Sequence, residues 1–126
     1  MVTSNPAPFP PDVLQASAAI TPDHYTASAT GGGFTAPASE GFLLSLYHVG
    51  VVNGDSFAAW RTEQSADGLS GWTLVPGTDL PASSTPDTVR TAAAFYSQPH
   101  LRVVMTLTGD DQDLFASSAV VFPIST

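Results

Sequence analysis

The 126-residue sequence contains no cysteine and no lysine, and each absence excludes a class of function. Without cysteine the chain has no disulfide, no thiolate metal site and no cysteine nucleophile. Arg61, Arg90 and Arg102 stand against 11 acidic residues, so the formal net charge is −8 at pH 7. Three scattered arginines cannot form the basic stripe that phosphate contacts require, so we expect neither a nucleic-acid partner nor docking to an anionic membrane.

Long apolar runs are absent as well. No stretch approaches the about 18 uninterrupted apolar residues of a membrane-spanning helix. Met1 to Asp12 has neither the basic start nor the apolar segment of a secretory signal. The sequence therefore predicts no signal peptide and no transmembrane segment.

The first twelve residues are instead rich in proline. Each proline fixes φ and pushes the preceding residue towards the β or polyproline region, which predicts an extended arm over 1–12. The remaining 13–126 have the length of one domain. Phe9 is the one large apolar residue of the arm and would anchor it against this domain or a neighbour. The predicted partner-binding residues are Pro6, Pro8, Phe9, Pro10 and Pro11.

The rest of the composition indicates a β-fold. Apolar residues make up 43% and charged residues 11%, and Thr, Ser, Gly, Pro and Ala replace the missing charge. Short apolar or alternating runs are separated by turn signals. Eight such runs predict an all-β, antiparallel β-sandwich of the jelly-roll or immunoglobulin-like kind. The predicted strands cover 13–20, 24–30, 42–52, 57–64, 72–75, 88–96, 100–108 and 114–122.

Particular runs carry more specific expectations. Thr21-Pro22 should end the first strand, and Phe42–Val52 is apolar enough to be a central strand that is buried on both faces. Asn53-Gly54 is a favoured hairpin turn pair. The stretch 76–87, with two prolines and S-S-T-P-D, predicts a loop. In 100–108 the alternation predicts that Leu101, Val103, Met105 and Leu107 point the same way.

No group of residues indicates catalysis. His24, His48 and His100 fall on separate predicted strands, with no carboxylate at metal-ligand spacing. No serine lies in a G-x-S-x-G elbow. A pair of glycosidase carboxylates stays open, because the fold sets their separation. We expect a non-enzymatic protein without catalytic residues, cofactor or metal.

An acidic cluster follows Gly109. Asp110, Asp111 and Asp113 could offer hard oxygen ligands to calcium, but the spacing and the final Glu of the helix-flanked calcium loop are missing. A solvated hairpin tip is the favoured interpretation, and ion binding is the alternative.

Glu63 to Trp72 is the most distinctive segment. Asp67-Gly68 provides the positive-φ position of a tight turn, and Ser65 can bond to the loop backbone. Trp72 begins the return strand and should pack inward. These residues form a structural hairpin motif, and a glycan contact through Trp72 is the alternative.

Three segments together resemble a known group of proteins. W-R-T-E-Q-S-A-D-G-L-S-G-W-T-L-V (Trp60 to Val75), T-V-R-T-A (Thr88 to Ala92) and H-L-R-V-V-M-T-L-T-G (His100 to Gly109) resemble small structural proteins encoded among the head genes of tailed bacteriophages. The resemblance covers roughly the last seventy residues. It implies a capsid decoration, or cement, protein on the outer capsid surface of a virion, which bridges major capsid subunits, often as a homotrimer. It implies no catalytic or cofactor residue.

The same S-x-D-G and W-T hairpin is also similar to discoidin-like carbohydrate-binding jelly rolls, although this chain is shorter and its N-terminal half does not match. A carbohydrate-binding module for host or surface glycans is therefore the alternative function. Such a module would expose Trp60, Trp72 or Tyr47 on a concave surface.

Overall fold

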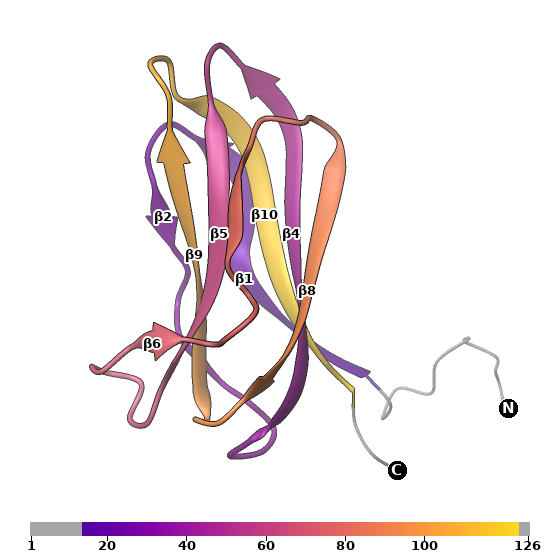
Figure 1. The fold of residues 1–126 in the computed structure, drawn as a ribbon, viewed down its shortest axis with the longest axis vertical. Coiled ribbons are helices and arrows are strands. Elements are labelled where there is room, and N and C mark those ends of the chain that lie inside the picture. Colours follow the sequence, from indigo (N-terminus) through magenta and orange to yellow (C-terminus); the bar gives the residue numbers. More distant parts are fainter. Residues whose placement is uncertain (1–13, 124–126) are drawn as a thin grey trace, which may run out of the picture.

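The computed structural model describes residues 14–123, which form a sandwich of two antiparallel β-sheets (Figure 1). The ten strands of this described part are β1 (Leu14–Tyr25), β2 (Ala29–Thr30), β3 (Phe34–Thr35), β4 (Gly41–Asn53), β5 (Phe57–Ser65), β6 (Thr73–Leu74), β7 (Leu80–Ser83), β8 (Thr88–Tyr96), β9 (His100–Thr108) and β10 (Asp113–Pro123). The predicted all-β sandwich is confirmed. The proposed arm over 1–12 lies outside the described residues.

The pairing joins strands from opposite ends of the chain. A four-stranded sheet has the order β1-β10-β4-β8, and a six-stranded sheet has the order β2-β9-β5-β6, with β3 also paired to β9 and β7 to β5. Thus β1 pairs with β10, β2 and β3 with β9, β4 with β8, and β5 with β7. An antiparallel ribbon wrapped into two sheets in this way is a jelly roll. The strand order therefore decides between the two sandwich types that the sequence left open.

The first strand corrects one prediction. Thr21-Pro22 does not end it, because β1 runs on to Tyr25. Register shifts between Ala18 and Ile20, and between Ile20 and Asp23, absorb the extra residues as β-bulges. Bulges and edge strands are the places where a sheet tolerates proline, and β1 is an edge strand.

Two turn predictions also change. Asn53-Gly54 does make a tight turn, with φ of 61° at Gly54, but it is not a hairpin, because β4 and β5 belong to different sheets. Within the predicted loop 76–87 the chain forms β7, which pairs with β5. Pro81 is accommodated there because β7 is a short edge strand.

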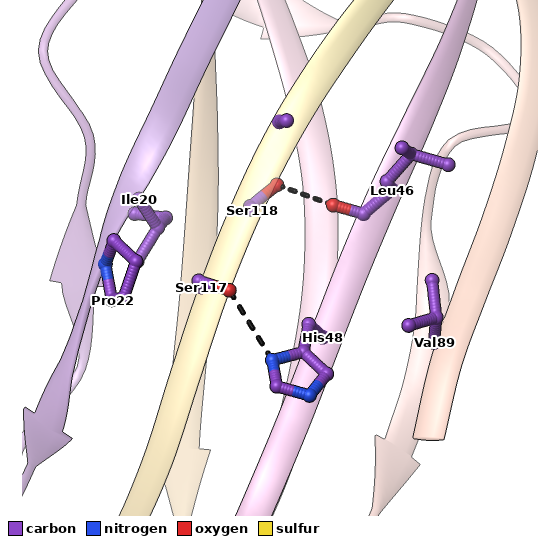
Figure 2. Close-up of a pocket in the computed structure, with 8 residues that line it drawn as sticks. Ile20, Pro22, Leu46, His48, Val89, Ser117 and Ser118 are labelled. Carbon is purple, nitrogen blue, oxygen red and sulfur yellow. Dashed lines mark hydrogen bonds between the residues drawn. The ribbon is translucent and has the colours of Figure 1, made fainter. Parts of the chain in front are cut away.

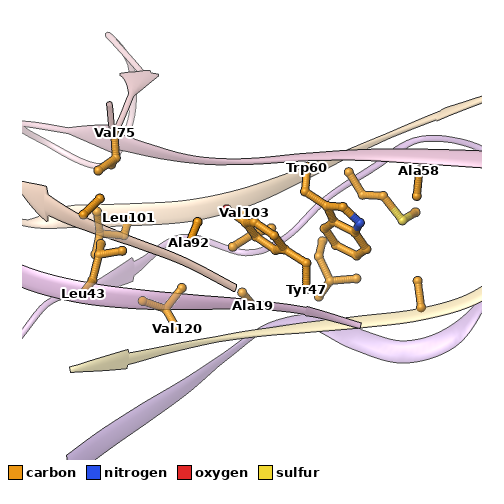
Figure 3. Packing of buried hydrophobic residues seen from close by; sticks show 14 of the residues in the cluster. Ala19, Leu43, Tyr47, Ala58, Trp60, Val75, Ala92, Leu101, Val103 and Val120 are labelled. Carbon is orange, nitrogen blue, oxygen red and sulfur yellow. The ribbon is translucent and has the colours of Figure 1, made fainter. Parts of the chain in front are cut away.

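The alternation along β9 places its apolar side chains in the core as predicted. Leu101, Val103 and Met105 are fully buried, and Leu107 is 4% exposed. Opposite them, β8 contributes the small side chains Ala92 and Ala94. The core also holds two large buried aromatic residues, Tyr47 and Trp60, whose rings stack at 5.1 Å with 12° between their planes (Figure 3).

A buried polar network joins the sheets beside this stack. The Tyr47 hydroxyl lies 2.8 Å from Thr62 Oγ1 and donates to the Thr78 carbonyl at 2.9 Å. Thr62 Oγ1 also lies 2.7 Å from Ser45 Oγ. The Thr78 hydroxyl lies 2.7 Å from the Val75 carbonyl, which it can donate to. Burial raises the pKa of Tyr47, so its hydroxyl keeps its proton and donates.

Tyr47→Phe removes one hydroxyl from this network. We expect a loss of about 1 to 3 kcal/mol in the free energy of unfolding, because the buried Thr78 carbonyl is left without its donor. Chemical denaturation followed by fluorescence measures it. The control is Tyr25→Phe, whose hydroxyl bonds to the Thr21 carbonyl near the surface. Equal losses in the two variants would contradict the bridging role of Tyr47.

Candidate functional site

The histidines lie apart, each beside a different polar neighbour. His24 Nδ1 is 3.4 Å from Asp113 Oδ1, His48 Nδ1 is 3.3 Å from Ser117 Oγ, and His100 Nδ1 is 3.4 Å from Thr35 Oγ1. Within residues 14–123, no three His, Cys, Asp or Glu side chains are grouped so that they could hold a metal ion. Within the described residues there is no helix long and apolar enough to cross a membrane.

The β9–β10 loop is organised around a buried serine. Ser56 Oγ lies within hydrogen-bond distance of the carbonyl oxygens of Asn53 and Asp111, at 2.9 and 2.8 Å. It also accepts the Asp113 N–H at 2.7 Å. The loop backbone therefore turns towards Ser56, while the Asp110 and Asp111 side chains face solvent.

The Ser65–Ser70 turn has the structure that its sequence predicts. The Asp67 carboxylate accepts the N–H groups of Leu69 and Ser70 at 2.9 and 3.0 Å. Ser65 Oγ donates to the Ser70 carbonyl and accepts the Gly68 N–H. Gly68 has φ of 75°. The hydrogen bond from the Leu69 N–H, followed by that from the Ser70 N–H, lowers the pKa of Asp67 to about 2.

Trp72 does not pack inward, so that prediction is wrong. It precedes β6, which pairs with the far end of β5, and its half-buried ring lies against Arg102 on the outer face of the six-stranded sheet. The Arg102 guanidinium carbon is 4.3 Å from the ring centroid. The tryptophan of the core is Trp60, which is 2% exposed. Trp60 and Tyr47 are therefore not available as glycan platforms.

The same outer face carries a charged cluster. Glu63 accepts hydrogen bonds from Arg61 and Arg102, each at 2.8 Å. Burial by itself would raise the pKa of Glu63, but the hydrogen bonds from the two arginines outweigh it, and the pKa is lowered. Two of the three arginines thus neutralise one carboxylate on this face.

The outer face of the four-stranded sheet has the opposite character, and we call it the uncharged face. Its side chains form cross-strand rows, as the registers of β10, β4 and β8 show. None of these described positions is Asp, Glu, Lys or Arg. The rows are Phe42–Phe95, Val121–Leu44–Ala93, Ala119–Leu46–Thr91 and Ser117–His48–Val89, with Phe115 beyond the last.

A groove of about 330 Å³ is hollowed into the uncharged face (Figure 2). Small side chains of β10, Ser117 and Ala119, form its floor, because they rise less than their neighbours. Pro22 of β1 lies on one side, and Leu46 and His48 of β4 on the other. Apolar atoms supply nearly all of the lining.

The sequence pattern does not identify the uncharged face, although one part of it is visible there. The apolar run Phe42–Val52 predicts a central strand that is buried on both faces. β4 is central, between β10 and β8, but only one of its faces meets the other sheet. Leu43 and Tyr47 point into the core, whereas Leu44 and Leu46 point outward and are half-buried. The strand does have a second apolar face, but this face lies on the outside of the sandwich and is not packed against the other sheet.

Six of the acidic residues belong to loops and strand ends at one end of the sandwich, and Figure 1 shows the β4–β5 and β9–β10 connections at that end. The Asp111 N–H bonds to the Asp55 carbonyl, and the Asp87 N–H to the Gly50 carbonyl, so these loops are neighbours. No arginine occurs in them. We call this the acidic end. Its residues are Asp23, Asp55, Asp87, Asp110, Asp111 and Asp113.

Asp67→Asn tests the turn through pH. The folded-state pKa of about 2 lies below the ordinary 3.8, so the carboxylate stabilises the fold fully above about pH 4 and loses this effect as pH falls towards 2. We expect the melting temperature of the parent chain to fall more steeply between pH 5 and 2 than that of Asp67→Asn. Calorimetry at stepped pH measures this, and parallel curves would contradict it.

Trp72→Ala tests the placement of the two tryptophans. Because Trp72 is half-buried, Trp72→Ala should lower the free energy of unfolding by well under the about 3 to 5 kcal/mol that removal of a buried tryptophan costs. Trp60→Ala should lose the full amount, because Trp60 is in the core. Denaturant titration compares the two variants. Equal losses would place Trp72 in the core. A glycan array with the parent chain and Trp72→Ala tests the carbohydrate alternative in the same proteins.

No family model and no curated protein matches the chain. A solved structure with a similar fold is a chain from the structure of infectious bursal disease virus, Gx strain. The TM-score is 0.54 at 10% sequence identity, and the match covers 88% of this chain. This chain spans about a third of the viral chain, 32% of its length. The likeness is one of fold.

Proposed function

We propose that the chain is a non-enzymatic structural protein of a virion, which decorates the outer surface of a capsid and bridges major capsid subunits. The jelly roll is a fold that viral capsid and lectin domains use, and the chain shares it with a chain of a virus structure. A fold by itself does not fix a function, so the proposal depends on the surfaces.

The observation that carries the proposal is that the surface has two separate areas suited to protein contacts, one acidic and one with no Asp, Glu, Lys or Arg at its described positions. The acidic end and the uncharged face are both broad and exposed. His48 contacts Ser117 and His100 contacts Thr35, whereas the histidine with a carboxylate neighbour is His24, beside Asp113. Surfaces of this kind suit binding to other proteins rather than turnover of a small substrate.

The acidic end suits a basic area on the shell. Exposed carboxylates without a nearby arginine produce a negative potential that attracts a cationic surface and orients the approach. Such contacts weaken with salt, because exposed charges further apart than about 8 to 10 Å are screened near physiological ionic strength. A decoration protein held in this way should leave the shell as salt rises.

Co-sedimentation with empty capsids of the encoding virus tests the proposal. We expect the full chain to pellet with the shells at low ionic strength and to be released as salt rises. Asp55→Asn with Asp110→Asn should weaken binding about tenfold or more, because both carboxylates lie at the acidic end. The matched control is Asp79→Asn with Glu40→Gln, which removes two charges from exposed residues elsewhere. A chain that stays in the supernatant at every salt concentration would overturn the proposal.

A further inference from the structure

The uncharged face exposes three large apolar side chains. Phe95 is 74% exposed, Val89 59% and Phe42 39%. They belong to continuous rows in which none of the described positions is Asp, Glu, Lys or Arg. Single exposed apolar residues need no explanation, but contiguous patches beyond a few hundred Å² mark interaction sites.

The size of the face suits a weak, reversible contact. Three strands about 4.8 Å apart and about nine residues long, at about 3.3 Å per residue, cover roughly 430 Å². Two opposed faces would bury roughly 900 Å² in total, which is the size of weak, transient protein interfaces.

We propose that two copies of this chain pack face to face through the uncharged face, with Phe95 of each copy seated in the groove of the other. This goes beyond the capsid role and does not require it. A second copy also carries a net charge of −8 and would be repelled at the acidic end. The uncharged face is where two such chains can meet without opposing carboxylates.

The face is self-complementary in shape. Phe95 projects at one corner and is flanked by Phe42 on the neighbouring strand, whose ring centroid is 5.1 Å away at 69° between the ring planes. The groove over Ser117 and Ala119 lies elsewhere on the same face. A two-fold axis midway between projection and groove carries each Phe95 into the partner's groove. A cavity of about 150 Å³ accepts benzene, so a groove of about 330 Å³ has room for a phenyl ring.

The edges of the four-stranded sheet are less suited to self-pairing. β1 is interrupted by two register shifts and contains Pro22, which lacks an N–H. Along β8, the Arg90 side chain donates to the Pro81 carbonyl of β7, so β7 lies beside this edge. Contact through the face is therefore favoured over extension of the sheet.

Sedimentation velocity and light scattering of the full chain, without capsids, test the proposal. We expect a dimer of twice the 13.0 kDa chain mass. Phe95→Glu should weaken it at least 30-fold by placing a charge in the groove, and Ala119→Phe by filling the groove. Leu69→Glu is the control, because Leu69 is 86% exposed on the hairpin loop, away from the face. A monomer up to millimolar concentration, a trimer, or a dimer insensitive to both variants would overturn the proposal.

Cross-linking locates the contact independently. The chain has no cysteine, so single cysteines are unambiguous. A mixture of Phe95→Cys and Ala119→Cys chains with a short bismaleimide should give mainly the 95–119 product. Leu69→Cys should give none with either. A dimer without the 95–119 product would place the contact elsewhere.

Circular dichroism melts separate loss of contact from loss of fold. Phe95→Glu should keep the unfolding temperature that the parent chain shows at a concentration where it is monomeric. The same variant should still co-sediment with capsids through the acidic end. Failure of the dimer and failure of capsid binding are thus distinguishable.

Discussion

The stack of Tyr47 on Trp60 is the contact on which the sandwich depends, because it joins the central strand of one sheet to the central strand of the other. The Tyr47 hydroxyl then bonds to Thr62 and to the Thr78 carbonyl, so the aromatic contact has one allowed orientation. A buried polar network is stable when every member has a partner, and it then specifies a single packing. That packing fixes which side of β4 is inside and which is outside.

The two outer faces that result differ in their physical chemistry. On the six-stranded sheet, Glu63 is held between Arg61 and Arg102, and Trp72 covers the second guanidinium. The two guanidinium groups exceed the one carboxylate by one charge, so this face is polar and charged. On the four-stranded sheet none of the described outward positions of β4, β8 and β10 is Asp, Glu, Lys or Arg, and among residues 14–123 nothing covers Phe95 or Val89 fully. The contrast assigns self-association to the second face.

The sequence pattern correctly predicts those features that depend on neighbouring residues alone. The period of two in β9 identified its buried side chains, and Asp67-Gly68 identified a turn whose carboxylate caps two N–H groups. The errors have a different origin. Alternation indicates that the two sides of a strand differ, but it does not indicate which sheet the strand joins. The sequence Asn53-Gly54 therefore predicts a hairpin, whereas β4 and β5 belong to different sheets. Trp60 and Trp72 look alike in sequence, and only long-range pairing puts the first in the core and the second outside. The uncharged face required three strands distant in sequence to lie side by side, and no local signal brings them together.

The uncharged face and the acidic end lie on different sides of the molecule, and this has a consequence for the proposed role. The acidic end consists of loops where strands end, whereas the uncharged face consists of side chains that stand on the strands. A dimer formed through the face therefore leaves both acidic ends free. The two-fold axis that carries Phe95 into the partner's groove crosses the strands, because Phe95 and the groove lie at different positions along them. The two acidic ends therefore point in opposite directions and cannot both reach one area of shell. The dimer joins two chains, and each of them meets a shell through a single, salt-sensitive acidic end.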